Sequence, residues 1–512
     1  MDLFWDGRAS LIFNGVNPFG FRDPEASLKR RTATGVESVH VSIPFASLAS
    51  QAVGPPLSRL EMSGHSRDFA EVARKLLAAD FIPLAGQLVH PQDSVLGGLV
   101  RTEQVTTCIT RRVRARPIQE CTVSEQQATG LGVGYAQLIA DAFKPEWWAN
   151  YTDANDYTLM DDNFTLFFGI ALQMYQSSLI ADETPFDRYM GAAINYRAGG
   201  TPESPMPVTG DPVALTPLQK KGLEVFQQVG CTNCHALPET SSSVVRSAGI
   251  EITRGGPLDL VNVAVPQQFL ELMPMGNGAL GVYDKGFYNI GVRPTEEDIG
   301  RGNDAPTGFP LSYSKLALLK WLHGKDGSDP LPAFVSEFVP DTGLNEADAS
   351  TSLEGLFGVF GSNGRTVTRG AFKTPMLRNQ ELQGPYFHSG QSGTLRHVVE
   401  FYARGGNFPQ TNEQNLDADM DPIPLLDVSP AGANVPEAEA NIQALVAFLS
   451  GALTDQRVIN QSAPFDHPQL FVPEGVKYSG ARPESIVELP ATGAAGISAS
   501  PWRFLNMDPQ SR

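Results

Sequence analysis

The strongest constraint on this chain is a five-residue string near its middle, Cys231-Thr232-Asn233-Cys234-His235. Two cysteines three positions apart lie on one side of a helical turn, and the next residue places an imidazole beside them. A helix is predicted to lead into the string. Thr216 suits its N-cap, Pro217 its first position and Gln219 the third position of a capping box. Gly230 is expected to end that helix.

The C-x-x-C-H spacing is the attachment signature of c-type haem. Both sulfurs can reach the two vinyl groups of one porphyrin, and the imidazole then faces the iron. A zinc site would need two further ligands at similar spacing, and none are nearby. A thioredoxin-like C-x-x-C would follow a strand rather than a capped helix. The sequence therefore predicts one covalent haem c on Cys231 and Cys234, with His235 as a ligand of the haem iron.

A haem iron needs a sixth ligand or an open face. The downstream side chains that are candidates for this position are Met273, Met275, Met376, His388, Tyr402 and Met420. Composition does not choose among them. Tyr402 shares one helical face with Leu395, Val398 and Val399, so periodicity alone favours a buried core aromatic at that position.

The length of the chain indicates how many compact units it forms, and its net charge indicates which partners it does not bind. A chain of 512 residues with 41% hydrophobic residues is expected to form two or three compact units. A formal charge of −18 argues against a nucleic-acid or anionic-membrane partner, and no apolar run is long enough to span a membrane. Thioether attachment belongs outside the cytoplasm, yet residues 1–8 lack the pattern of a secretory signal. We therefore expect a periplasmic protein whose natural start lies upstream of Met1.

Helical periodicity dominates the chain, whereas strand signals are few and short. Helices are predicted around 69–77, 129–147, 163–182, 312–323, 394–403 and 437–450. The Pro- and Gly-rich stretch 199–212 predicts a linker between domains. The expected fold class is mainly α.

Cys108 and Cys121 are the two cysteines outside the C-x-x-C-H string. Their spacing is too wide for a second haem motif. As an even pair in an oxidising compartment they are expected to form a disulfide. Free buried thiols are the alternative.

From Thr216 to Ser450 the chain resembles the C-terminal domain of the bacterial di-haem cytochrome c peroxidases and MauG. The matching strings are LTPLQKKGLEVFQQVGCTNCHALP and FKTPMLRNQELQGPYFHSGQSGTLRHVVEFYARGG. In that family the sixth iron ligand falls fourteen residues after the His of the PYFH string, which here leads from His388 to Tyr402. The position is Met in the peroxidases and Tyr in MauG-like members. The resemblance thus implies that Tyr402 is a ligand rather than a core aromatic, and that Arg378 lies close to the haem propionates.

The N-terminal part resembles the second half of the family's peroxidatic haem domain. FWDGRA at 4–9 matches the segment that carries a tryptophan between the two haems, here Trp5. SLASQAVGPPLSRLEM at 47–62 matches the distal wall of the peroxidatic haem, which implies catalytic roles for Gln51, Pro55 and Glu61. Glu61 would act as general acid and base on peroxide, Gln51 would hydrogen-bond it, and Pro55 would keep one face apolar. Without the resemblance, Gln51 and Glu61 are ordinary surface residues.

One departure from the family pattern is important. The first C-x-x-C-H of the family lies before the FWDGRA string, and this sequence has none there. We therefore expect a longer full-length protein that carries a second haem c, and the alternative is a genuine mono-haem protein. The resemblance also implies a calcium site between the haems. Two of its ligands would be the backbone carbonyls of Gln383 and Pro385.

These expectations combine into one organisation and function. The resemblance implies two cytochrome c-like helical domains, the first incomplete, with long loops and a C-terminal tail. Residues 1–205 would be the remainder of the peroxidatic domain, with an insertion between Trp5 and Gln51. Residues 213–452 would be the C-terminal cytochrome c domain, and 453–512 the tail. The expected activity is reduction of hydrogen peroxide, with electrons from a small cytochrome or cupredoxin or from a protein substrate. The alternative is an electron-transfer cytochrome without enzymatic activity, and a haem sensor has no specific feature in its favour.

Overall fold

The computed structural model describes most of the chain and carries side chains. The described residues are 2–63, 67–113, 116–149, 151–190, 211–235, 270–324, 357–360, 365–473 and 486–497. The predicted linker at 199–212 and the last fifteen residues of the tail lie almost wholly outside these ranges. None of the helices within them has the length and apolar content needed to cross a membrane.

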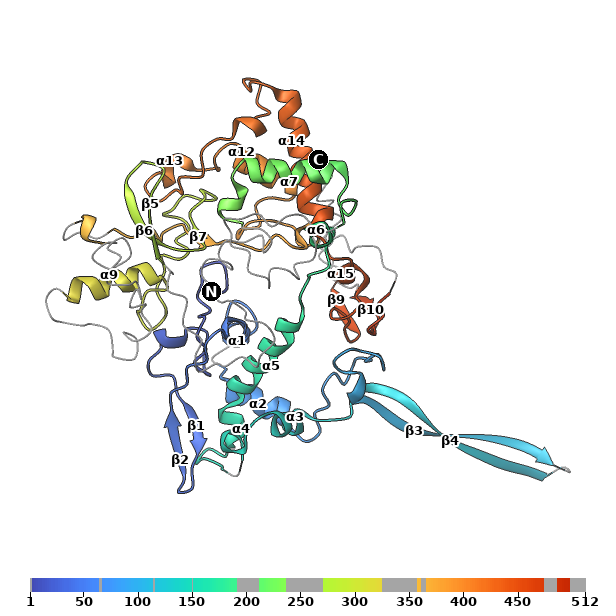
Figure 1. The fold of residues 1–512 in the computed structure, drawn as a ribbon. Coiled ribbons are helices and arrows are strands. Elements are labelled where there is room, and N and C mark those ends of the chain that lie inside the picture. The colour runs from blue at the N-terminus through green and yellow to red at the C-terminus, as the bar shows by residue number, and fades with distance from the viewer. Residues whose placement is uncertain are drawn as a thin grey trace, which may run out of the picture.

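Helices form most of the regular structure (Figure 1). Those with five or more residues are α1 Ser47–Val53, α2 Phe69–Leu77, α3 Tyr135–Ala142, α5 Phe164–Ser178, α6 Pro185–Met190, α7 Pro217–Gln228, α9 Tyr313–Gly324, α12 Leu395–Ala403, α14 Val435–Ala447 and α15 Gln456–Asn460. Two short helices are α4 Leu159–Asp162 and α13 Pro409–Asn412. The helices predicted from periodicity are confirmed. The segment 129–147 is helical only over α3, because β4 occupies its first residues.

Five separate two-stranded antiparallel sheets accompany the helices. Their strands are β1 Leu28–Arg31 with β2 Val36–Val39, β3 Val100–Val113 with β4 Arg116–Leu131, β5 Leu270–Pro274 with β6 Leu280–Asp284, β7 Phe287–Tyr288 with β8 Phe372–Lys373, and β9 Leu470–Pro473 with β10 Ile486–Leu489. The expectation that all strands are short was wrong for β3 and β4, which have 14 and 16 residues. Helical residues still outnumber strand residues, whereas the two cytochrome c-like domains stay a prediction.

The main core of the C-terminal part joins α7, α12 and α14, which lie side by side at the top of Figure 1. Helix α7 begins with the predicted capping box, in which Thr216 Oγ1 accepts from the Gln219 amide at 3.2 Å. Gly222 lets α7 approach α14 closely, because a Cβ at that position would lie 2.0 Å from the carbonyl oxygen of Ala444. Phe226 and Phe448 pack together in this core, with ring centroids 5.5 Å apart.

The N-terminal segment packs against residues that are distant in sequence. Leu11 and Phe21 are buried in one core with Leu316 and Trp321 of α9. A second core joins α1, α2 and α5, and α5 then runs towards α6 beneath the C-terminal helices (Figure 1). The N-terminal segment is therefore part of the same packed body as the residues between β5 and α9.

Strands β3 and β4 form a long arm that projects from the body (Figure 1). Cys108 and Cys121 are register partners on its two strands, and their sulfurs form a disulfide with a Cα–Cα distance of 4.0 Å. The predicted disulfide is confirmed, and the alternative of free buried thiols was wrong, because both residues are exposed on the arm. An isolated two-stranded hairpin is only marginally stable in water, so a covalent link between its strands stabilises the arm.

Replacing both arm cysteines with serine is expected to open the arm without affecting the cores. A cross-link that closes a loop of this length, with a sequence separation of 13, contributes about 3 kcal/mol to local stability. Limited trypsin digestion should therefore cut the Cys108→Ser/Cys121→Ser variant near Arg111 much faster than the wild type. The thermal midpoint of the body should stay the same. Equal cleavage rates would show that the disulfide does not hold the arm.

Candidate functional site

One apolar cavity lies among α7, α12, α14 and the β7–β8 pair. The apolar side chains on its walls include Val229, Tyr288, Ile290, Val292, Leu377, Leu395, Val398, Val399, Leu445 and Leu449. Cys231, Cys234, His235 and Tyr402 line the same cavity. Residues that are 167 positions apart in sequence thus line one cavity whose walls suit a flat, largely apolar ligand.

The cysteine string starts directly after α7 ends. Gly230 has a left-handed backbone with φ of 80°, a conformation that a glycine adopts without strain. Cys231–Asn233 then form a single 3-10 turn, and the amide of His235 donates to the carbonyl of Cys231 at 2.9 Å. Asn233 Nδ2 donates to Asp419 Oδ2 at 3.1 Å, which ties the turn to the loop after α13. The sequence thus positions both thiols and the imidazole at one end of a well-packed helix.

The surroundings of the two sulfurs in the string bear on their reactivity. Cys231 and Cys234 are not linked to each other. Burial raises the pKa of Cys231 to about 12, so at neutral pH the residue is a thiol rather than a thiolate. A redox C-x-x-C motif depends on a reactive thiolate, which this environment disfavours. The described residues also contain no cluster of three or more His, Cys, Asp or Glu side chains suited to a metal ion.

Tyr402 reaches the cavity from α12. Its ring packs edge-on against Phe401 at 5.2 Å and lies 6.5 Å from Phe387. Burial raises the pKa of the Tyr402 phenol, and the nearby Cys234 and Cys231 sulfurs raise it further. The phenol and both cysteines border the same cavity, and the role of Tyr402 as an iron ligand stays a prediction.

The other candidate ligands are arranged differently. Met420 and His388 also line the cavity, whereas the lining formed by the described residues does not include Met376, Met273 or Met275. His388 is engaged elsewhere, because its Nε2 pairs with Asp298 and its ring stacks on Phe372 at 3.6 Å. The thioether of Met420 belongs to a buried cluster with Phe401 and remains an alternative to Tyr402.

Trp5 lines the cavity next to His388, and the two ring centroids are 6.3 Å apart. The Trp5 carbonyl accepts a hydrogen bond from the amide of Lys373 in β8 at 2.8 Å. Its side chain remains 41% exposed. The structure therefore brings Trp5 to the edge of the predicted haem pocket, although Trp5 and Cys231 are more than 200 residues apart in sequence.

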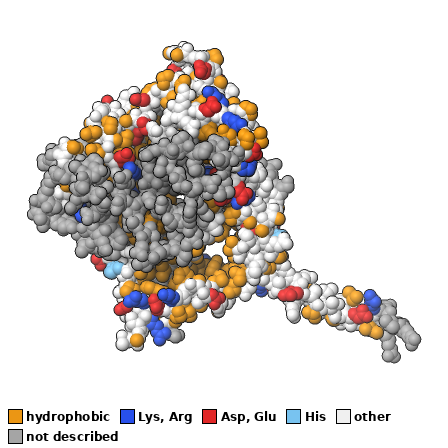
Figure 2. All heavy atoms as spheres, in the orientation of Figure 1, with side chains coloured by type: hydrophobic (Ala, Val, Ile, Leu, Met, Phe, Trp, Pro, Cys, Tyr) orange, Lys and Arg blue, Asp and Glu red, His pale blue; other side chains and the backbone are white. Residues whose placement is uncertain are grey.

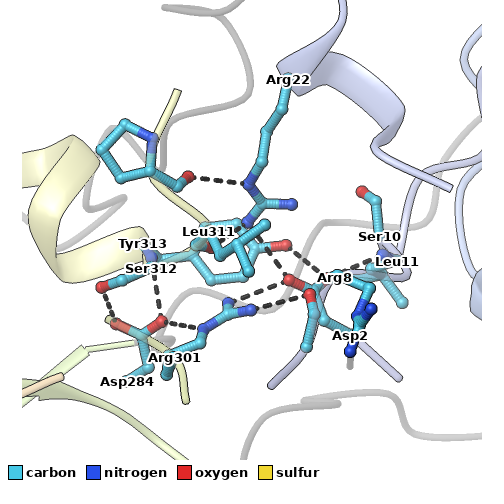
Figure 3. Close-up of polar contacts among 12 residues, drawn as sticks. Asp2, Arg8, Ser10, Leu11, Arg22, Asp284, Arg301, Leu311, Ser312 and Tyr313 are labelled. Atoms are coloured by element: carbon cyan, nitrogen blue, oxygen red, sulfur yellow. Dashed lines mark hydrogen bonds and ion pairs between the residues drawn. The ribbon is translucent and has the colours of Figure 1, made fainter. Parts of the chain in front are cut away.

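A buried network of charges holds the segment around Trp5 in place (Figure 3). Asp2 Oδ2 accepts from Arg301 at 2.9 Å and from Arg22 at 3.2 Å, and all three side chains are fully buried. Arg301 Nε also donates to Asp284 at 2.8 Å, and Arg301 Nη1 donates to the carbonyl of Gly7 at 2.9 Å. Burial raises the pKa of Asp2, but the two guanidinium groups outweigh it and leave that pKa below its ordinary value.

Asp284 links this network to α9. Its carboxylate accepts hydrogen bonds from the amides of Tyr313 and Ser314 at 2.9 and 2.8 Å, at the start of that helix. The Tyr313 hydroxyl in turn donates to Asp2 at 2.9 Å. The segment from Asp2 to Gly7 is therefore held at both of its ends, at the Asp2 carboxylate and at the Gly7 carbonyl.

The side chain of Arg378 forms an ion pair with a residue of α6. Its guanidinium forms two hydrogen bonds with the carboxylate of Asp187 in α6, at 2.6 and 2.7 Å, and a third with the carbonyl of Ala181. Arg378 is not among the described residues that line the cavity. Its expected place beside the haem propionates stays a prediction.

Gln51, Pro55 and Glu61 lie on α1 and the loop that follows it. The aromatic ring of Phe4 approaches Gly54, so the FWDGRA segment contacts this loop. Glu61 is exposed, and its neighbours Leu60 and Met62 are 97% and 71% exposed. Hydrophobic side chains also gather on the face of the molecule around α2 and α3 (Figure 2). The catalytic roles of Gln51, Pro55 and Glu61 stay predictions.

Gln383 and Pro385, the two predicted calcium ligands, line the same cavity as Tyr402 and His388. Their calcium site stays a prediction. Sequence reasoning missed Asp417, which also lines the cavity and whose pKa burial raises to about 6. It also missed Asp298 and the network of Asp2, Arg22 and Arg301. Pairs this distant in sequence leave no periodic signal.

No protein-family model matches the chain. The chain is similar to the methylamine utilization protein MauG of Methylorubrum extorquens, with 47% identity over 49 residues, which cover 10% of this chain and 14% of MauG. It is also similar to the cytochrome-c peroxidase IdrP1 of Pseudomonas sp. strain SCT, with 25% identity over 240 residues, which cover 46% of this chain and 40% of IdrP1. The chain thus aligns with less than half the length of either relative.

Solved structures give weaker similarity. A variant of the diheme peroxidase BthA from Burkholderia thailandensis has a TM-score of 0.34 at 15% identity, covering 86% of this chain and 72% of BthA. A MauG-like protein associated with microbial copper homeostasis has a TM-score of 0.26 at 16% identity, covering 59% of each chain. TM-scores of this size do not establish a shared fold. The sequence matches to MauG and IdrP1 support a relationship between this chain and the di-haem cytochrome c peroxidases and MauG.

Proposed function

We propose that the chain binds a c-type haem in the cavity, attached to Cys231 and Cys234 and ligated by His235 and Tyr402. The observation that carries this proposal is the cavity itself, which unites these four side chains within apolar walls. A bound haem would supply a one-electron redox centre. Tyr402 would bind as a phenolate, a hard anionic ligand that lowers the reduction potential relative to methionine.

The proposed activity is that of a periplasmic oxidoreductase of the di-haem peroxidase and MauG type, with hydrogen peroxide as oxidant. Electrons would come from a small redox protein or a protein substrate. Trp5, at the edge of the cavity and beside His388, is suited to carry electrons between this site and a second haem. Glu61 would take and return the proton that moves between the two oxygens of peroxide, while Gln51 would donate a hydrogen bond to them and Pro55 would exclude water.

The experiment compares Glu61→Gln with the wild type, both expressed from the complete gene with every haem attached. General acid–base catalysis contributes about 10²–10⁴-fold to rate, so peroxide turnover should fall by that factor. The rate at which a reduced cytochrome donates electrons should stay unchanged. Glu71→Gln, an exposed glutamate of the nearby α2, is the control and should leave both rates unaltered. Wild-type turnover in Glu61→Gln would contradict the peroxidatic role.

A non-enzymatic electron carrier is the second candidate. The exposure of Glu61 favours it, because a catalytic carboxyl normally faces an enclosed pocket. This function predicts fast electron exchange with a redox protein and no peroxide turnover in the wild type.

A further inference from the structure

Lys373 is a cation in an unusual position. Of the described residues that line the cavity, it is the only Lys or Arg. Its backbone is fixed on both sides, because β8 pairs Lys373 with Phe287 of β7 and the Lys373 amide donates to the carbonyl of Trp5. Phe372, the residue before it, stacks on His388. A rigid strand therefore places this side chain at the cavity.

The ammonium group lacks an anionic partner in the described part of the chain. Its Nζ donates to the carbonyl of Thr374 at 3.2 Å, and no carboxylate lies within 4.0 Å of it among those residues. The side chain is half-buried, and burial lowers its pKa. Holding a cation in a partly desolvated place costs free energy unless an anion lies nearby. Proteins retain such cations where a charged ligand completes the pair.

We propose that Lys373 binds a propionate carboxylate of the haem. This inference rests on the proposed function, because it needs a haem in the cavity. Haem carries two propionates, and each needs a cation or a hydrogen-bond donor when it is removed from water. Arg378, the other candidate, already forms a bidentate ion pair with Asp187. Lys373 is therefore a cofactor-binding residue that also places a positive charge beside the redox centre.

The test is the reduction potential of the attached haem in the Lys373→Met variant, measured by spectroscopic titration. A cation near the iron favours the reduced form, so its removal should lower the potential, and Lys373→Arg should restore most of the wild-type value. Lys221→Met removes the same charge from the exposed face of α7, where Lys221 lies 3.9 Å from Glu224, and should leave the potential unchanged. Tyr402→Met should raise the potential, which shows that the titration detects changes at the haem.

The intact mass of the denatured protein shows whether haem is attached, and so separates a failure of the proposed haem site from a failure of the proposed Lys373 contact. If wild type carries no covalent haem, the proposed function fails and the role of Lys373 fails with it. If wild type and Lys373→Met both carry haem at the same potential, only the role of Lys373 is wrong. A lower potential in Lys373→Met, restored by arginine, supports the propionate contact and excludes a purely structural role.

Discussion

Replacing Arg301 with methionine is expected to destabilise the protein by about 3–5 kcal/mol. The guanidinium is fully buried and pairs with both Asp2 and Asp284, so its removal leaves two carboxylates without their shared cation. The loss should also release the Asp2–Gly7 segment, since Arg301 holds the Gly7 carbonyl. Urea denaturation followed by circular dichroism measures the free energy of unfolding.

The matched control for this prediction is Arg8→Met. Arg8 lies in the same N-terminal segment and pairs with Asp6 at 3.1 Å, but its side chain is 54% exposed. Surface ion pairs contribute about 0–1 kcal/mol, so this variant should unfold almost like wild type. Equal stability losses in the two variants would contradict the structural role of the buried network. Increased chymotrypsin cleavage next to Trp5 in Arg301→Met alone would show that the network positions that segment.

The sequence predicted the local elements around the site because they depend on neighbouring residues. The capping box of Thr216 and Gln219 and the end of α7 at Gly230 are set within a few positions along the chain. The periodicity of α12 predicted a buried face that includes Tyr402 but did not show that this face borders a cavity. Only the family resemblance singled out Tyr402.

Features that depend on distant contacts were beyond the reach of sequence patterns. The β3–β4 arm was missed because its strands mix Thr, Arg and Glu with few apolar residues, so neither face shows a regular alternation. The union of Asp2, Arg22 and Arg301 spans about 300 positions and has no local signature. The sequence also did not predict that Lys373 lines the cavity, because a lysine in an otherwise ordinary strand is expected to face solvent.

Replacing both cysteines of the haem string is expected to abolish covalent haem attachment completely. The two sulfurs are the only groups in the described cavity lining that can form thioether bonds, since Cys108 and Cys121 are joined to each other on the arm. The fold should survive the change, because the alanine side chain is smaller than the thiol side chain that it replaces. The disulfide between Cys108 and Cys121 on the arm should be unaffected.

The most direct measurement is the intact mass of the denatured protein after expression in a bacterial periplasm equipped for c-type haem maturation. The wild type should carry the mass of one covalent haem per copy of this chain, and Cys231→Ala/Cys234→Ala should carry none. The Cys108→Ser/Cys121→Ser variant, the matched double control, should keep the haem. A wild-type chain with the mass of the polypeptide alone, or a haem lost on acid–acetone extraction, would contradict the assignment of this cavity as a c-type haem site.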